Sequence, residues 1–180
     1  EIHKEILKKK YANEFNYDFI KKDCLKTNNI SVMSYGNQLS LSIIAKQIND
    51  DGFYYKNIML RNAYDVFLLS KKTIAKDAFS KFNTLKNPLN CFLASCFEVF
   101  NKPNSLKYTS TKEIETYLAR YNELLNNDQL KNKHNKKIDQ KIFIRSRLYI
   151  IYKSFFNKPY RGWLLKRITD KNWQKEKLIQ

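Results

Sequence analysis

The sequence predicts a mainly α-helical protein, a single multi-helix domain of about seven or eight helices with at most one short N-terminal strand. Glycine and proline are scarce, with three of each among 180 residues, which excludes the frequent tight turns of an all-β fold. Apolar residues recur at helical spacing in several segments. Hydrophobic residues make up 43% of the chain and aromatic residues 14%, enough for a folded core rather than a disordered chain.

The first half of the chain predicts three helices after an undecided N-terminus. Residues 1–10 fit either a short strand or the start of a helix, because their apolar residues follow neither period. A short helix is expected over 15–25. Asn37 is a candidate N-cap for the next helix, which carries apolar residues at helical spacing. A third helix is predicted within 57–72, where Leu60, Tyr64, Phe67 and Leu68 form one stripe.

The middle of the chain predicts three further helices. Asp77 can cap one helix, and Pro88 can start the next, which ends near Phe100. Ser110 and Glu113 have the spacing of a capping box that opens a third.

The last third begins with residues 126–137, a polar stretch of low complexity that predicts a loop. Residues 138–156 are apolar on nearly every side of a helix, which predicts a central, buried element. Pro159 can start a further helix, and a short one containing Trp173 closes the chain.

Positive charge is the strongest compositional signal. The formal net charge is +17, from 34 basic and 17 acidic residues, and it indicates a polyanionic partner. Only six of the basic residues are arginines, although arginine is preferred for bidentate phosphate recognition; lysine-rich composition alone is therefore an open alternative. Residues 131–180 hold 15 basic and three acidic residues, a net +12, so the charge is concentrated in the last third.

The cysteines and histidines predict neither disulfides nor a metal site within this chain. Three cysteines without CxxC spacing, Cys24, Cys91 and Cys96, are typical of reduced thiols in a cytoplasmic protein. The two histidines lie far apart in the sequence and form no ligand cluster. We expect no contact with a membrane interior, because the most apolar stretch is interrupted by three basic residues.

No self-sufficient catalytic motif occurs in the sequence. Three widely spaced glycines cannot build a P-loop or a dinucleotide-binding turn, both of which bring several backbone amides to a phosphate. The GxSxG pattern of serine hydrolases is absent as well.

Three segments in order nevertheless resemble one family. The segments "EIHKEIL", "LSLSIIAKQI" and "MLRNAYDVFLL" resemble the rear half of bacterial nucleotidyltransferase-like proteins of the polymerase-β superfamily. These are related to the abortive-infection nucleotidyltransferase toxins of toxin–antitoxin systems. The closing segment "FFNKPYRGWLLKRITDKNWQKEKL" is similar to the last helices of such proteins.

The resemblance implies roles for five residues. Glu1 would be the third acid that binds catalytic Mg²⁺, and His3 would follow it on the same strand. Lys56 and Arg61 would bind the nucleotide triphosphate, with Asp65 beside them in the catalytic region. The Gly-Ser and Asp-x-Asp motifs of the superfamily would precede Glu1 and are missing here. We therefore expect this chain to be inactive alone and to require Mg²⁺ and an N-terminal catalytic segment or partner protein.

Asp65 has two interpretations that the sequence leaves open. It lies in the middle of an apolar helical run, where an unpaired carboxylate is unfavourable. Arg61 precedes it by four residues, so a simple ion pair on one helix face is one explanation. The other is a nucleotide site, in which Asp65 would face a cleft with Lys56 or Arg61 nearby.

The tail predicts nucleic-acid binding, with an amphipathic packing role as the alternative. Aromatic and basic side chains alternate there, as in surfaces that stack bases and track phosphates. The candidate nucleic-acid-binding residues are Arg161, Trp163, Lys166, Arg167 and Lys171. Three functions thus stay open: part of a nucleotidyltransferase that positions nucleotide or RNA, a non-catalytic RNA- or DNA-binding module, and a protein-interaction domain.

Overall fold

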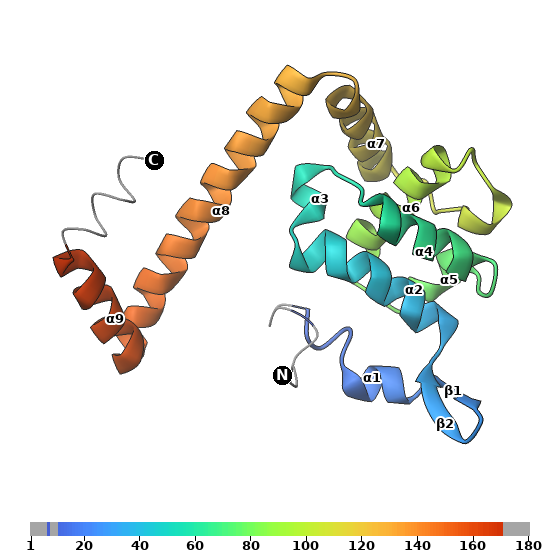
Figure 1. The fold of residues 1–180 in the computed structure, drawn as a ribbon, viewed down its shortest axis with the longest axis horizontal. Coiled ribbons are helices and arrows are strands. Elements are labelled where there is room, and N and C mark those ends of the chain that lie inside the picture. The colour runs from blue at the N-terminus through green and yellow to red at the C-terminus, as the bar shows by residue number, and fades with distance from the viewer. Residues whose placement is uncertain (1–6, 8–10, 171–180) are drawn as a thin grey trace. The chain divides into compact units, whose positions relative to one another are not determined.

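A computed structural model, which describes residue 7 and residues 11–170, confirms the mainly α-helical fold (Figure 1). The described residues form nine α-helices, one π-helical segment, one 3₁₀ segment and one two-stranded sheet. Two of the nine, α3 and α5, are single turns of four residues. The elements are α1 (Tyr17–Lys21), β1 (Cys24–Thr27), β2 (Ile30–Met33), α2 (Tyr35–Ile44), η1 (Ala45–Asn49), α3 (Gly52–Tyr55), α4 (Leu60–Ser70), α5 (Ala75–Ala78), α6 (Lys86–Val99), η2 (Asn104–Leu106), α7 (Lys112–Leu125), α8 (Asp128–Phe156) and α9 (Lys158–Thr169).

The chain divides into two compact units, residues 1–131 and residues 132–180. The sequence predicted one helical domain over residues 1–180, without this division. The first unit holds the hairpin and the helices up to α7, and the second holds most of α8 together with α9.

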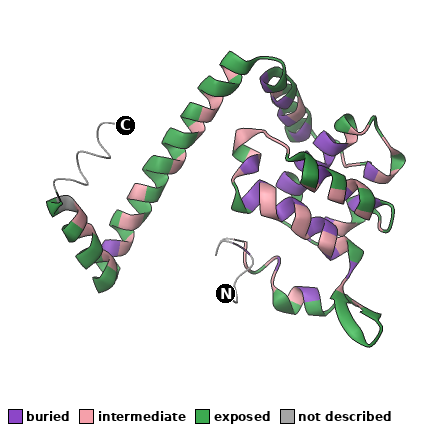
Figure 2. Ribbon diagram, in the orientation of Figure 1, coloured by how far each residue is buried: buried purple, intermediate pink, exposed green. Residues whose placement is uncertain are grey.

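Helix α6 is the central helix of the first unit. Every residue from Pro88 to Cys96 is buried (Figure 2). Helices α2, α4 and α7 contact it, and its opposite faces contribute to two apolar clusters, one with α2 and α4 and the other with α7. The sequence prediction placed the central helix at 138–156 instead, and that was wrong.

The misplacement has a simple physical reason. Residues 88–96 contain no charged side chain, so every face of that segment can be buried without stranding a charge. The apolar stretch in α8 contains Arg145, Arg147 and Lys153, and only Ser154 of α8 is buried. The absence of charge, more than the count of apolar residues, marks the buried helix.

The polar stretch 126–137 is helical from Asp128 onward rather than a loop. Asn127 begins this helix, because its side-chain oxygen accepts a hydrogen bond from the backbone N–H of Leu130 at 2.9 Å. The stretch contains no glycine or proline, and its lysines and glutamines tolerate helix well. Low complexity alone was therefore a poor indicator of a loop.

The β-hairpin was missed by the sequence prediction, which placed a helix end and a break there. Strands β1 and β2 pair antiparallel, with Cys24 opposite Met33 and Thr27 opposite Ile30. Asn28 and Asn29 form the two-residue turn, with φ of 49° and 63°. Asparagine tolerates this left-handed backbone, and two such residues between short β-forming runs are a hairpin signal.

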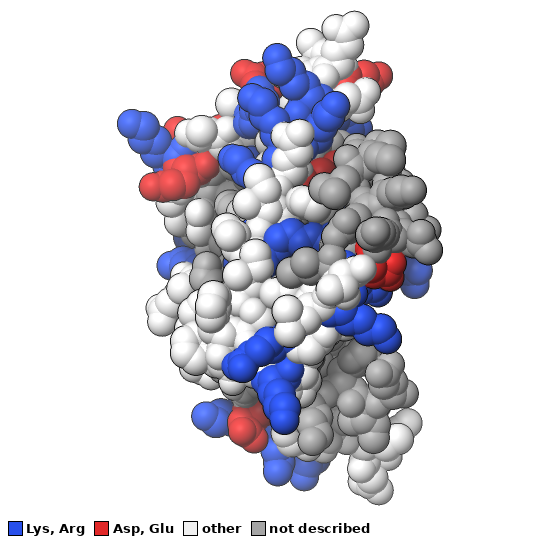
Figure 3. Space-filling model, turned by 90° about the vertical axis from the view of Figure 1, so that its left-hand side faces the viewer, with Lys and Arg blue, Asp and Glu red and all other residues white. Residues whose placement is uncertain are grey.

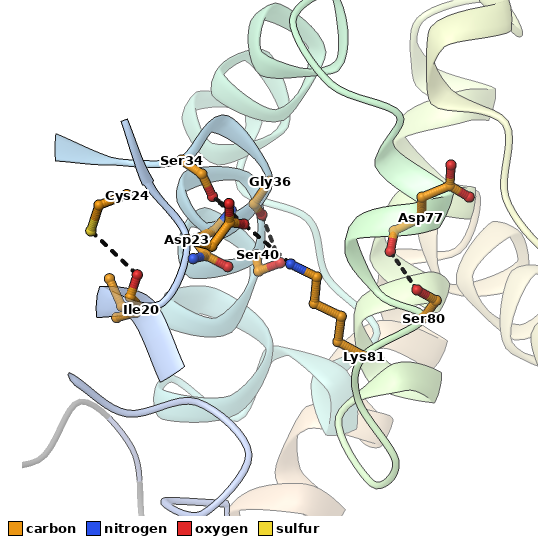
Figure 4. A network of polar contacts seen from close by, with 10 residues as sticks. Ile20, Asp23, Cys24, Ser34, Gly36, Ser40, Asp77, Ser80 and Lys81 are labelled. Carbon is orange, nitrogen blue, oxygen red and sulfur yellow. Dashed lines mark hydrogen bonds and ion pairs between the residues drawn. The ribbon is translucent and has the colours of Figure 1, made fainter. Parts of the chain in front are cut away.

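A polar network fixes the base of the hairpin (Figure 4). The carboxylate of Asp23 accepts hydrogen bonds from the Ser34 hydroxyl at 2.9 Å and from the Lys81 ammonium at 3.2 Å. These bonds lower the pKa of Asp23 below its usual value. The network joins the start of β1, the N-terminus of α2 and the segment between α5 and α6.

Glu14 and Phe15 attach the N-terminal segment to the start of α6. The Glu14 carboxylate accepts hydrogen bonds from the backbone N–H groups of Asn83, Thr84 and Leu85 at 2.8, 3.0 and 3.3 Å, and from the Thr84 hydroxyl. The Phe15 side chain beside it is fully buried in the core. A carboxylate thus satisfies the unpaired amides just before a helix, where negative charge is favourable.

Three predicted helix caps were displaced. The N-cap of α2 is Ser34, whose hydroxyl accepts from the Asn37 N–H at 3.3 Å, so Asn37 lies inside the helix. Thr111 rather than Ser110 caps α7, and the Ser110 hydroxyl instead bonds the carboxylate of Glu115.

Asp77 is the third residue wrongly predicted as a cap. It lies within α5, whose N-cap is Ile74. The predictions of helices starting near Pro88 and at Pro159 are confirmed. Where several polar residues neighbour one another, sequence alone left the cap ambiguous by one to three positions.

Candidate functional site

Lys56 packs against a pair of aromatic rings in the first unit rather than extending from an open surface. Its ammonium nitrogen is 4.3 Å from the ring centre of Phe53 and 4.4 Å from that of Tyr117. It also donates a hydrogen bond to the backbone carbonyl of Phe53 at 3.0 Å. The two rings stack with their centres 5.6 Å apart. Burial in this apolar setting lowers the pKa of Lys56 below its usual value.

The backbone around Lys56 is held in an unusual shape. Asp51 and Lys56, which flank α3, both have left-handed φ, 55° and 53°. A Cβ on Gly52 would lie 2.6 Å from the carbonyl oxygen of Lys46, so only glycine fits this position. This tight turn directs Lys56 inward to the rings, and its cation packs α3 against α7.

Arg61 and Asp65 do not form the predicted pair or a site with Lys56. Arg61 is exposed and Asp65 is half-buried on α4. The ion pairs and hydrogen bonds found among the described residues join neither side chain to the other or to Lys56. The structure therefore does not bring the three predicted nucleotide-site residues into contact.

Helix α4 also turns a different face inward from the one expected. Its buried residues are Ala63, Val66 and Ser70. Leu60 and Tyr64 of the predicted stripe are 67% and 53% exposed. Small residues face the core because α2 packs closely against α4. Asp65 thus borders a surface stripe and not the core.

Four residues with predicted roles lie outside the described residues: Glu1, His3, Lys171 and Trp173. Their roles, and the Mg²⁺ expected at Glu1, stay predictions. Within residue 7 and residues 11–170, no group of three or more His, Cys, Asp or Glu side chains is arranged to hold a metal ion.

The second unit presents many large apolar side chains at its surface. Phe155 and Phe156, at the end of α8, are 69% and 78% exposed, and Trp163 on α9 is 42% exposed. Such a concentration of exposed aromatic and aliphatic residues is a common feature of interaction surfaces. Its other exposed members are Phe143, Ile144, Leu148, Tyr149, Ile151, Tyr152 and Leu165.

Basic side chains lie directly beside these aromatic rings. The Arg147 guanidinium is 4.7 Å from the Phe143 ring centre, and that of Arg167 is 5.4 Å from the Trp163 ring. Residues 132–170 carry eleven basic and two acidic residues, a net +9. Figure 3 shows Lys and Arg side chains spread among neutral ones rather than separated from them.

Lys153 joins α8 to α9 through two tyrosines. Its ammonium nitrogen lies 4.9 Å from the Tyr149 ring centre and 5.0 Å from that of Tyr160. Hydrogen bonding to Tyr149, with a contribution from Tyr160, raises the pKa of Lys153. The cation is therefore retained at any physiological pH.

The predicted nucleic-acid-binding residues fall into two groups. Arg161 is engaged in the fold, because its guanidinium donates to the backbone carbonyls of Ser154 and Phe155 at 3.2 and 3.1 Å. It satisfies the last carbonyls of α8, a common role for arginine at a helix C-terminus. Trp163 and Lys166 are exposed, and Arg167 is half-buried on α9 beside the tryptophan.

A hollow of about 280 Å³ lies at the corner between α8 and α9. Ile150, Pro159, Tyr160 and Trp163 line it. Proline at the start of α9 fixes the turn that brings the two aromatic residues opposite Ile150. The hollow is apolar, with cations on the rings that form its walls.

Comparison with protein-family models, curated proteins and solved structures finds no match for this chain. None of the described helices has both the length and the apolar character needed to cross a bilayer.

Proposed function

We propose that the chain binds single-stranded nucleic acid, with α8 and α9 as the binding surface and without catalysis by this surface. The observation that carries the proposal is a set of aromatic rings that each have a cation alongside: the exposed Phe143, Tyr149 and Trp163, and the half-buried Tyr160. Exposed rings can stack on bases while neighbouring cations contact the phosphates, a combination that suits single strands whose bases are accessible.

Basic side chains point to several sides of α8. At about 100° per residue, Arg147 points about 200° from Arg145, and Lys153 points to a third side. Positive charge is therefore presented around much of the helix, as contact with the phosphates of a nucleic acid requires.

The net charge also supports an anionic partner over a second copy of the chain. Two surfaces of residues 132–170 that each carry +9 would repel on approach. A polyanion gains from the same charge through release of its counterions.

A labelled single-stranded oligonucleotide tests the proposal by fluorescence anisotropy across a salt series. With about four phosphates contacted, the logarithm of the binding constant should fall with that of salt with a slope near −3. Replacing Lys166 and Arg167 together by Gln should weaken binding and make the slope shallower by about one unit or more. Duplex DNA of the same length should bind more weakly, because its bases are not free to stack.

The matched control replaces Lys21 and Lys22, an exposed basic pair in the first unit, by Gln. It removes the same charge from a part of the chain that does not belong to the proposed binding surface and should leave the salt slope unchanged. No measurable binding at low salt, or equal loss in the two double variants, would contradict the proposal.

A further inference from the structure

We infer that the hollow between α8 and α9 seats a single base of the bound strand, stacked against Trp163 and Tyr160. The inference rests on the proposed function and adds to it the one position at which the protein holds a base rather than merely lying beside it. The exposed aromatic rings of α8 lie on a convex helix surface, whereas the lining of this hollow comes from both α8 and α9.

The size and lining of the hollow suit one aromatic ring system. Its volume of about 280 Å³ lies just below the range of drug-sized ligand pockets, roughly 300 to 1,000 Å³, and so suits a smaller group. Aromatic rings gain most from offset or edge contacts with other rings. Trp163 and Tyr160 supply such contacts on α9, and Ile150 closes the hollow from α8.

Two cations lie beside the two aromatic rings that line the hollow. Lys153 lies 5.0 Å from the Tyr160 ring, and Arg167 lies 5.4 Å from the Trp163 ring. Each wall of the hollow therefore carries a positive charge beside an apolar surface. A nucleotide has the complementary layout, with an apolar ring face and anionic phosphates on either side, whereas an apolar peptide side chain or an acyl chain carries no negative charge to match the two cations.

The lining also determines what the hollow can distinguish. It is apolar, so it offers few hydrogen-bond groups to read the edge of a base. Selectivity should follow stacking area instead, with purines preferred over pyrimidines. We expect the same lining to bind RNA and DNA with similar affinity at this position.

Tryptophan fluorescence tests the inference directly. The chain has two tryptophans, and Trp173→Phe leaves Trp163 as the sole reporter in the full chain. Titration with adenosine monophosphate should quench the emission of Trp163, uridine monophosphate should quench it less, and ribose phosphate, which keeps the charge without the base, should not quench it. Equal quenching by ribose phosphate would overturn the inference. A blue shift of the Trp163 emission with anionic phosphatidylglycerol vesicles, without any response to the nucleotides, would also overturn it.

Oligonucleotide binding separates this inference from the proposed function. Trp163→Leu keeps an apolar side chain but loses the stacking ring, and should weaken binding of an oligoadenylate at least about fivefold, whereas Trp163→Phe should restore most of it. Leu60→Ala, an exposed leucine on α4 in the first unit, is the control that should leave affinity unchanged. Circular dichroism verifies that each variant keeps its helix content.

The outcomes are distinct. Salt-dependent oligonucleotide binding that is equal in Trp163→Leu and the unaltered chain would overturn the base site and leave the proposed function standing. Absence of oligonucleotide binding in the unaltered chain would overturn both.

Discussion

Removing the charge of Glu14 should weaken the attachment of the N-terminal segment to α6. The Glu14 carboxylate accepts hydrogen bonds from three consecutive backbone N–H groups, at residues 83–85, and from the Thr84 hydroxyl. A side chain that caps a helix contributes about 1 kcal/mol. Glu14→Gln keeps one acceptor oxygen and loses the charge, and the freed N–H groups remain accessible to water, so we expect a loss of about 1 kcal/mol in the free energy of unfolding.

The effect should depend on pH in a defined direction. Burial acts to raise the pKa of Glu14, but hydrogen bonds from the Thr84 side chain and the three backbone amides outweigh it, so its pKa lies below the ordinary 4.5. A group whose pKa is lowered by folding stabilises the fold above its unfolded pKa, and this contribution is lost as pH falls through the folded pKa. The difference between the unaltered chain and Glu14→Gln should therefore be present at pH 7 and shrink below about pH 4.

Urea unfolding at pH 7 and at about pH 3 measures both effects. Amide hydrogen exchange at Asn83, Thr84 and Leu85 locates the change. Glu98→Gln is the matched control, because Glu98 forms a surface ion pair with Lys102 at 3.5 Å and should cost less than about 0.5 kcal/mol. An unfolding free energy within about 0.3 kcal/mol of the unaltered chain, or an equal deficit at both pH values, would refute this account of Glu14.

Thiol reagents should modify Cys24 in the native protein and reach Cys91 and Cys96 only on unfolding. Both of these cysteines are buried, and burial raises the pKa of Cys91 to about 12. Labelling of two or more thiols in the native protein would contradict this prediction. Asp65→Asn should change the free energy of unfolding by less than about 1 kcal/mol, since Asp65 forms no ion pair with Arg61. A larger loss of stability in urea unfolding would indicate that Asp65 makes a structural contact. Lys56→Met should leave the unfolding free energy within about 1 kcal/mol at pH 7. The variant loses the attraction between the cation and the rings, but it no longer buries a charge. A loss several times larger would show that the cation is essential to packing α3 on α7.

The sequence by itself determined the helical class, the helix starts near Pro88 and at Pro159, and the concentration of charge in the last third. Each of these depends on local chemistry: scarcity of turn residues, the fixed φ of proline, and simple counts of charge. The reduced state of the thiols was also a local inference, and the structure describes all three cysteines as unpaired. The nucleotidyltransferase resemblance stays a prediction, because no comparison bears on it and Glu1 lies outside the described residues.

Only the tertiary structure decided which apolar segments are buried and which polar residues meet. Apolar periodicity was the same kind of signal in α6 and α8, yet α6 is surrounded by α2, α4 and α7 while the apolar residues of α8 are largely exposed. The absence of charge in residues 88–96 permits burial of that helix, but whether an apolar face is covered depends on the positions of other elements. For the same reason Lys56, for which the family resemblance implies a triphosphate, contacts two rings contributed by α3 and α7. The hollow between α8 and α9 likewise arises from a turn that brings Ile150 opposite Trp163, a meeting of side chains thirteen residues apart that helical spacing alone could not predict.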